Sequence, residues 1–213
     1  MSTTVPKTVP IAAATDPPTS DTVLRRGPRF SLHPIGPEDL DAVDSWLADD
    51  RRRADYVHSD VSHEDVAAAG FLAVAQEVPS AQVYTARVPQ YGCVGLVTFH
   101  PSATLQGLYD GDIIVAPSLP LPGVGTEVFA LGIDMLFSEA AANKLWGFVS
   151  LGNPASERMC HRLGFRREGF VREHLPTNDG FQDAFIYSLL RRDWRSPVPI
   201  EVPAADDAGG TSR

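Results

Sequence analysis

The sequence predicts a mixed α/β (α+β) fold, in which a mixed β-sheet carries helices on both faces. Strand-like runs and runs with helical apolar spacing follow one another in the order β-α-α-β-β-β-α-β-α-β-β. A glycine-containing segment separates the central strand-like run, at 112–116, from a long apolar helix. Between two tails of mostly small and polar residues, residues 29–195 have the size of one ordinary domain.

The two tails, residues 1–28 and 196–213, are rich in proline, alanine, threonine and other small residues. Neither contains enough large apolar side chains to offset the conformational entropy lost on ordering. Both tails are therefore predicted to be disordered, and the folded domain is expected to comprise residues 29–195.

The first half of the domain alternates short strands with two helices. In the first helix, Leu40, Val43 and Trp46 recur at helical spacing, and Ser62 suits the N-cap of the second. The segment Gln-Tyr-Gly at 90–92 favours a hairpin between two strands. These signals predict a strand at 30–35, helices at 37–48 and 62–78, and strands at 81–88 and 93–100.

The second half carries the strongest boundary signals. The predicted helix at 126–142 is apolar on nearly every side, which indicates burial against a sheet. Asn153 and Pro154 suit the N-cap and first position of the next helix, and Gly164 suits its left-handed C-cap. Strands are predicted at 111–116, 145–151, 165–175 and 181–190, with a turn at 176–180.

Composition limits the possible function classes. The net charge of −9 opposes nucleic-acid binding through phosphate neutralisation; it suits attraction of a cationic amine, or simply solubility. The sequence lacks an apolar run near the roughly 18 residues of a membrane span, and its N-terminus lacks the layout of a secretory signal. Two cysteines are too few for a disulfide framework. A cytoplasmic protein is expected, and the preference for arginine over lysine suggests a GC-rich bacterial genome.

The segment Gly-Val-Gly-Thr-Glu at 123–127 predicts an anion site. Glycines between a strand and a helix leave backbone N–H groups uncovered at the positive end of the helix, which favours a pyrophosphate. A dinucleotide-binding fingerprint would need a third glycine where Val128 stands, and the Lys-Ser or Lys-Thr of a P-loop is missing. An ordinary strand-to-helix turn is the alternative interpretation.

Taken together, these patterns resemble the GNAT superfamily of acyl-CoA-dependent N-acyltransferases, especially the branch of ribosomal-protein N-terminal acetyltransferases and related small-amine enzymes. The segment 123–127 is similar to the family's Gly-x-Gly/Ala-Thr-Glu loop. Asn153, Ser156 and Leu-Gly-Phe at 163–165 are similar to its Asn-x-x-Ser helix. Glu-Gly at 168–169, with Asp183 and Tyr187, resembles the closing hairpin of this branch. One departure is Pro120, which stands where the family usually has Gln or Arg.

The resemblance implies a GNAT-like fold and acetyl-CoA as cosubstrate. The implied reaction moves an acetyl group to a primary amine, on an antibiotic, an amino sugar or a peptide N-terminus, by direct attack in a ternary complex. A CoA-binding regulatory module and a transferase for a longer acyl-CoA are alternatives. No metal, nucleic acid or membrane partner is expected, and the chain is expected to be a monomer or a homodimer. The expected cofactor-binding residues are Ile113, Ile114, Val115, Gly123, Val124, Gly125, Thr126, Asn153, Ser156 and Arg158.

Amide formation needs a proton acceptor for the amine and a proton donor for the leaving thiolate. The resemblance makes Ser156 the donor; the alternative is an exposed first-turn serine. The acceptor is left open. Asp110 and Asp112 lie at the start of the central strand and His100 ends its neighbour, so these three could converge, and Glu173 lies near where relatives often place a glutamate. The six histidines show no spacing typical of metal ligands. Cys160 lies inside a helix and is interpreted as a buried packing residue.

Overall fold

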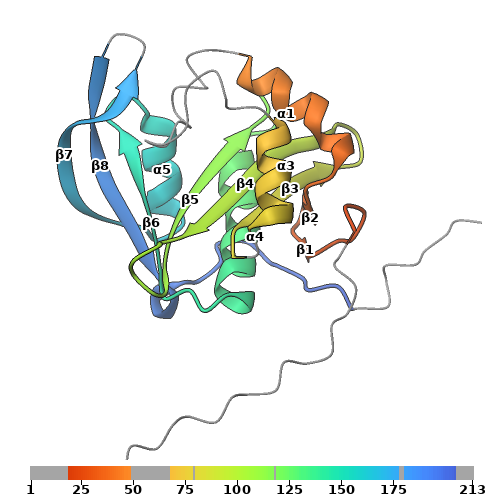
Figure 1. Cartoon of the computed structure of the whole chain (residues 1–213). Coiled ribbons are helices and arrows are strands. Elements are labelled where there is room, and N and C mark those ends of the chain that lie inside the picture. The colour runs from red at the N-terminus through yellow and green to blue at the C-terminus, as the bar shows by residue number, and fades with distance from the viewer. Residues whose placement is uncertain (1–18, 49–67, 79, 118, 178–179, 205–213) are drawn as a thin grey trace, which may run out of the picture.

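The computed structural model describes residues 19–48, 68–78, 80–117, 119–177 and 180–204 (Figure 1). Eight strands form one sheet in the order β1-β2-β3-β4-β5-β6-β8-β7. All neighbouring pairs are antiparallel except β5 and β6, which are parallel, so the sheet is mixed as predicted. The strands are β1 (Arg25–Arg26), β2 (Ser31–Pro34), β3 (Gln82–Val88), β4 (Gly92–Pro101), β5 (Leu108–Val115), β6 (Lys144–Ser150), β7 (Arg166–Thr177) and β8 (Gly180–Leu190).

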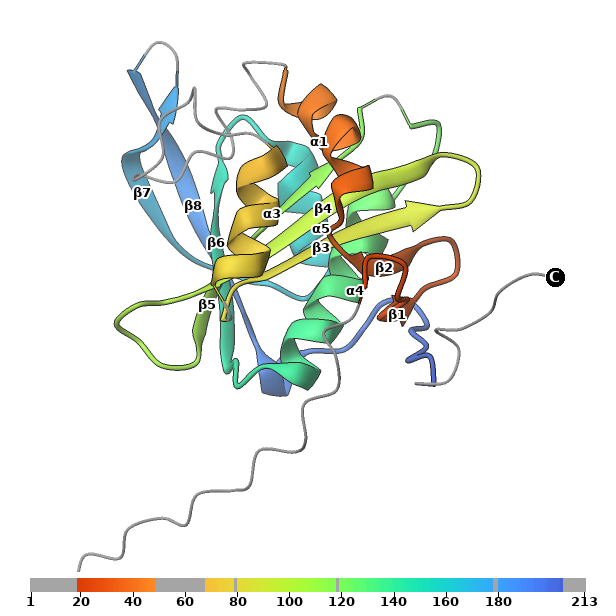
Figure 2. The ribbon, with the colours of Figure 1, turned by 45° about the vertical axis from the view of Figure 1, so that its right-hand side comes forward.

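Helices cover both faces of the sheet, and each face has its own apolar core (Figures 1 and 2). On one face α1 and α3 pack against β3, β4 and β5. On the other face α4 and α5 form the main core. The helix α4 lies so close to β4 that a Cβ on Gly132 would be 2.8 Å from Val97 Cγ1. The helices are η1 (Pro37–Asp39), α1 (Leu40–Leu47), α3 (Ala68–Glu77), α4 (Val124–Glu139), α5 (Pro154–Arg162) and η2 (Arg191–Asp193).

The predicted order of elements is confirmed for the described residues, with differences at several boundaries. The helix predicted at 126–142 begins at Val124, because Gly123 adopts a left-handed φ of 77° at the N-cap and lets the helix start earlier. The predicted strand at 111–116 begins at Leu108. The start of the helix predicted at 62–78 lies outside the described residues, as does part of the turn at 176–180.

The inner ends of the two tails differ from the expected disorder. Arg25 is only 3% exposed, and its guanidinium donates to Asp134 at 2.9 Å and to Glu139 at 3.0 Å, both on α4. Arg26 and Glu201 exchange two backbone hydrogen bonds of 2.9 and 2.8 Å. Sheet pairing and ion pairs order these segments despite their poor apolar content; residues 1–18 and 205–213 lie outside the described ranges.

The parallel pair β5–β6 comes apart halfway along its length. Its pairing runs from Leu108 with Lys144 to Asp110 with Trp146 and ends there. Beyond that point β5 continues beside β4 as far as Val115, while β6 continues beside β8 as far as Ser150. The two strands therefore diverge and open a gap in the middle of the sheet. In the part of the chain that the structure describes, no helix combines the length and apolarity needed to cross a membrane.

Candidate active site

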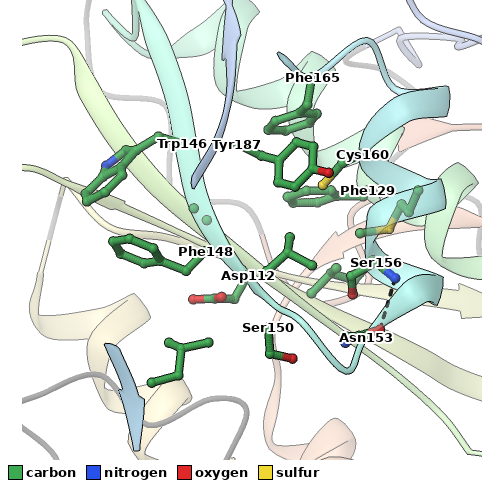
Figure 3. Close-up of a pocket in the computed structure, with 16 residues that line it drawn as sticks. Asp112, Phe129, Trp146, Phe148, Ser150, Asn153, Ser156, Cys160, Phe165 and Tyr187 are labelled. Carbon is green, nitrogen blue, oxygen red and sulfur yellow. Dashed lines mark hydrogen bonds between the residues drawn. The ribbon is translucent and has the colours of Figure 1, made fainter. Parts of the chain in front are cut away.

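Two adjoining cavities lie in and beside the gap between β5 and β6. The outer cavity, of about 570 Å³, lies between the N-terminus of α4, the end of β5 and the helix α5. The inner cavity, of about 90 Å³, lies between the diverging strands themselves (Figure 3). Both are lined by Ile113, Asn153, Ser156 and Met159, so they form one continuous cleft that leads from the helix end into the sheet.

The N-terminus of α4 opens onto the outer cavity. Gly123 is the N-cap residue and has no side chain to cap the helix. The first intrahelical bond runs from the Glu127 N–H to the Gly123 carbonyl at 3.2 Å. The N–H groups of the intervening residues, 124–126, come before that bond and have no carbonyl one turn earlier in the helix. All three residues line the outer cavity. This arrangement suits a bound anion, because the positive end of the helix macrodipole lies at residues that line a cavity.

Further positive charge comes from α5. Arg158 and Arg162 are exposed, lie one turn apart, and both line the outer cavity. Guanidinium groups bind phosphate oxygens through paired N–H donors, so these two side chains add positive charge that suits a bound anion. On the opposite side the apolar loop residues Leu119 and Leu121 line the cavity and also pack against the main core.

The start of α5 places Asn153 and Ser156 where the two cavities meet. Asn153 Oδ1 accepts a hydrogen bond of 3.0 Å from the Ser156 N–H, which confirms the predicted N-cap (Figure 3). Pro154 occupies the first position, and Gly164, with φ of 83°, ends the helix as predicted. Since the cap fixes this first turn, the Ser156 side chain is held at the passage from the outer to the inner cavity.

The inner cavity has an apolar floor on the α4/α5 side. Phe129 and Phe165 stack with ring centroids 6.2 Å apart, and Tyr187 of β8 lies beside them, 2% exposed. Burial, with a smaller effect of Glu157, raises the pKa of Tyr187 above its usual value near 10, so the phenol stays protonated at neutral pH. Burial also raises the pKa of Cys160 to about 12, which agrees with its interpretation as a packing residue.

Nine of the ten predicted cofactor-binding residues line the outer cavity. The exception is Ile114, whose side chain is 3% exposed and packs in the core beneath α1 and α3. The nine are Ile113, Val115, Gly123, Val124, Gly125, Thr126, Asn153, Ser156 and Arg158.

Of the four residues predicted to act in catalysis, the structure brings two together. Asp112 and Ser156 both line the inner cavity. His100 lines neither cavity, because its pair partner on β5 is Asp110, at the closed end of the β5–β6 gap. Glu173 lines neither cavity because it is exposed in an irregular stretch of β7, with a φ of 47° and its N–H bonded to Asp183.

Sequence reasoning missed the aromatic residues of β6. Trp146 and Phe148 line the inner cavity together with Ser150, and all three lie on one face of the strand by alternation. The alternation is visible in the sequence of 144–150, but it does not reveal which face borders a cavity. That depends on the divergence of β6 from β5.

The described geometry agrees with the comparisons to known proteins. The profile of the Acetyltransferase (GNAT) domain matches residues 29–166, and the chain therefore belongs to the GNAT acetyltransferase family. The putative ribosomal N-acetyltransferase YdaF of Bacillus subtilis is 27% identical over 100 residues, which cover 47% of this chain and 55% of that protein. The chain spans about half the length of the curated relatives it matches.

Solved structures share the fold at lower sequence identity. Spermidine N-acetyltransferase from Vibrio cholerae, in complex with CoA and spermine, superposes with a TM-score of 0.65 at 17% identity, over 78% of this chain and 97% of that one. RimJ from Mycobacterium smegmatis, in complex with CoA-disulfide, gives a TM-score of 0.62 at 18% identity, over 76% and 81% of the two chains. These likenesses confirm the predicted GNAT-like fold.

Proposed function

We propose that this protein is an N-acetyltransferase that moves an acetyl group from acetyl-CoA to a primary amine. The observation that carries the proposal is the N-terminus of α4, which opens onto a cavity continuous with the gap between β5 and β6. An anion site and a gap in a sheet, joined in one cleft, suit a ligand with a diphosphate at one end and a reactive thioester at the other. The CoA complexes of two fold relatives support this choice.

The outer cavity would hold the cofactor. The amides of residues 124–126 would receive the diphosphate, with Arg158 and Arg162 close to the phosphates. The diverging segment of β5, residues 113–115, would align the pantetheine arm along the gap. A backbone N–H there would stabilise the oxyanion that forms at the thioester carbonyl, which is often the largest catalytic contribution.

The inner cavity would hold the reacting groups. The amine nitrogen attacks the thioester carbon, the C–S bond breaks, and the proton that the amine loses must be matched by one that reaches the thiolate. Alkyl and α-amines have pKa values near 10.4 and 8, so a proton acceptor is useful at neutral pH. The geometry favours Asp112 as acceptor over His100 and Glu173, and Ser156 as donor, with the protonated Tyr187 as a second donor on the same cavity.

Calorimetry with acetyl-CoA, followed by CoA-thiol release with a panel of amines, tests the proposal. The panel includes aminoglycosides, polyamines, amino sugars, arylalkylamines and peptides with free N-termini. We expect saturable acetyl-CoA binding and amine-dependent thiol release. An absence of acetyl-CoA binding would contradict the proposal. Binding without release for any amine would instead support the CoA-binding regulatory module, and faster release from bulkier thioesters would support a longer acyl group.

A further inference from the structure

The inner cavity has a second wall on the α1/α3 side of the sheet. Asp112 lies on this face, because Ile114, two residues further along β5, packs in the core beneath α1 and α3. Trp146 and Phe148 lie on the same face, because Leu145 and Val149, at alternate positions of β6, belong to the main core on the other side. Figure 3 shows the Asp112 carboxylate on the same side of β6 as the two aromatic rings.

The two rings form one aromatic wall. Trp146 and Phe148 meet edge to face, with centroids 5.0 Å apart and an interplanar angle of 70°. His174 of β7 packs on Phe148 with a centroid distance of 4.0 Å, and Leu175 extends the apolar lining. Trp146 and Phe148 are half-buried and border the cavity, so part of each side chain is available to a ligand.

The described residues of this wall carry little charge. Among the described residues that line the inner cavity, Asp112 is the only acid. A polyamine with several ammonium groups needs several carboxylates, whereas one carboxylate beside aromatic rings matches one ammonium next to an apolar body. The overall net charge of −9 therefore does not describe the described lining of the inner cavity, which is mostly uncharged.

We propose that the acceptor is a primary amine attached to an aromatic or bulky apolar group. Its apolar part packs against Trp146 and Phe148, and its ammonium group faces Asp112. This acceptor class rests on the proposed function. The aromatic wall removes water from the amine, which favours the neutral form that can attack the thioester, whereas the Asp112 carboxylate favours the ammonium form until it accepts the proton. Trp146 and Phe148 are thus specificity-determining residues.

The test compares two primary amines in the thiol-release assay: 2-phenylethylamine, which carries a ring, and spermidine, which carries several charges and no ring. We expect kcat/KM to be at least roughly 10-fold higher for 2-phenylethylamine. Phe148→Ala should raise the KM for 2-phenylethylamine about 10-fold and leave the KM for acetyl-CoA within about 2-fold. Phe148→Leu, which keeps an apolar side chain, should recover part of the loss.

Phe170→Ala is the matched control, because Phe170 is an exposed phenylalanine on β7 that lines neither cavity. It should change neither KM. Equal or better turnover of spermidine, or an unchanged amine KM in Phe148→Ala, would overturn the acceptor class while leaving the proposed function in place. If Phe148→Ala loses acetyl-CoA binding, the decision passes to Phe148→Leu and Trp146→Leu. If the unaltered protein neither binds acetyl-CoA nor releases thiol, the proposed function fails, and the acceptor class with it.

Discussion

Arg29 and Glu127 form an ion pair of 2.7 Å at the mouth of α4, although 98 residues separate them in the sequence. The Arg29 backbone N–H also donates to Glu127 at 2.8 Å, and the Arg29 guanidinium donates to the Pro122 carbonyl at 2.9 Å. One arginine therefore joins the first turn of α4 to the loop that precedes it. The buried Glu127 carboxylate lies in the turn where a helix favours negative charge.

We expect Arg29→Ala to reduce both stability and acetyl-CoA affinity. The buried Glu127 carboxylate would lose its charged partner, which costs about 1–3 kcal/mol in free energy of unfolding. The loop before Gly123 would lose its link to α4, so the amides of the anion site would be less well positioned. Denaturant unfolding and calorimetry with acetyl-CoA measure the two effects.

Arg26→Ala is the control for this change, because Arg26 is exposed and makes its hydrogen bonds through the backbone. It should leave stability and affinity nearly unchanged, while Arg29→Lys should keep part of both. An Arg29→Ala protein that binds acetyl-CoA as tightly as the original would show that the loop does not depend on this arginine.

Two substitutions at Gly125 should distinguish an effect on stability from an effect on acetyl-CoA binding. A Cβ at Gly125 would lie 3.4 Å from Met159 Sδ, an ordinary contact, so Gly125→Ala should keep the stability or raise it by up to about 1 kcal/mol. Gly125→Leu would extend a larger side chain into the outer cavity and should lower acetyl-CoA affinity by roughly 10-fold or more, since the cofactor would lose that space. Thermal unfolding with calorimetry checks both variants.

Gly123→Ala should reduce stability, in contrast to Gly125→Ala. Space around Gly123 is ample, with the nearest heavy atom 3.7 Å from a built Cβ, but its φ of 77° disfavours any residue with a Cβ. We expect a loss of about 1 kcal/mol in stability.

For the Gly125 variants, the contradicting outcome concerns affinity. If Gly125→Leu binds acetyl-CoA normally, the outer cavity is not the cofactor site.

Local chemistry explains which parts of the site the sequence could predict. The Asn153 cap and the Gly164 stop depend on a few neighbouring residues, and each is found where it was expected. The aromatic wall could not be predicted in this way. Trp146 and Phe148 border a cavity only because β6 leaves β5 and pairs with β8, a relationship that depends on the order of the whole sheet.

The same limit explains why the predictions for His100 and for Arg25 differ from the structure. His100 and Asp112 lie on adjacent strands, which made convergence reasonable, but the register pairs His100 with Asp110 and Asp112 with Thr98. The poor apolar content of the first tail led to a prediction of disorder that included Arg25. This residue is ordered by its ion pairs with α4. Pairing register and long-range charge contacts were not encoded in local patterns.

Ser156 and Tyr187 can be separated as proton donors by paired substitutions. If Ser156 supplies the proton to the leaving thiolate, Ser156→Ala should lower kcat by roughly 10²–10⁴-fold without a matching rise in the KM for acetyl-CoA. Tyr187→Phe should then change kcat little. The reverse ranking, together with loss of the alkaline limb of the pH–rate profile in Tyr187→Phe, would assign the role to the buried tyrosine.

Neither cysteine should react in the folded protein at pH 8. Burial is the main cause that raises the pKa of both Cys93 and Cys160 to about 12, so little thiolate is present. Ellman's reagent should find almost no reactive thiol in the native chain and two after denaturation, matching the two cysteines of the sequence. A fast native reaction would show that one of the sites opens. A slow one makes the protein's own thiols a negligible background in the thiol-release assay.

His33 should make the protein less stable in mild acid. Its ring is buried on β2, where Ser31 Oγ lies 2.8 Å from Nε2. Burial together with the nearby Arg87 lowers the pKa of His33 below 6.5, although the Ser20 backbone, Asp39 and Asp21 oppose the shift. The unfolded chain therefore takes up a proton before the folded one does as the pH falls. The stabilising contribution is complete above pH 6.5 and is lost as the pH falls through the folded pKa.

Denaturant midpoints at several pH values from about 7.5 down to 5 should fall for the original protein and change less for His33→Gln. His161→Gln, at an exposed position on α5, should keep the original slope. An identical slope in His33→Gln would show that other groups control the acid sensitivity.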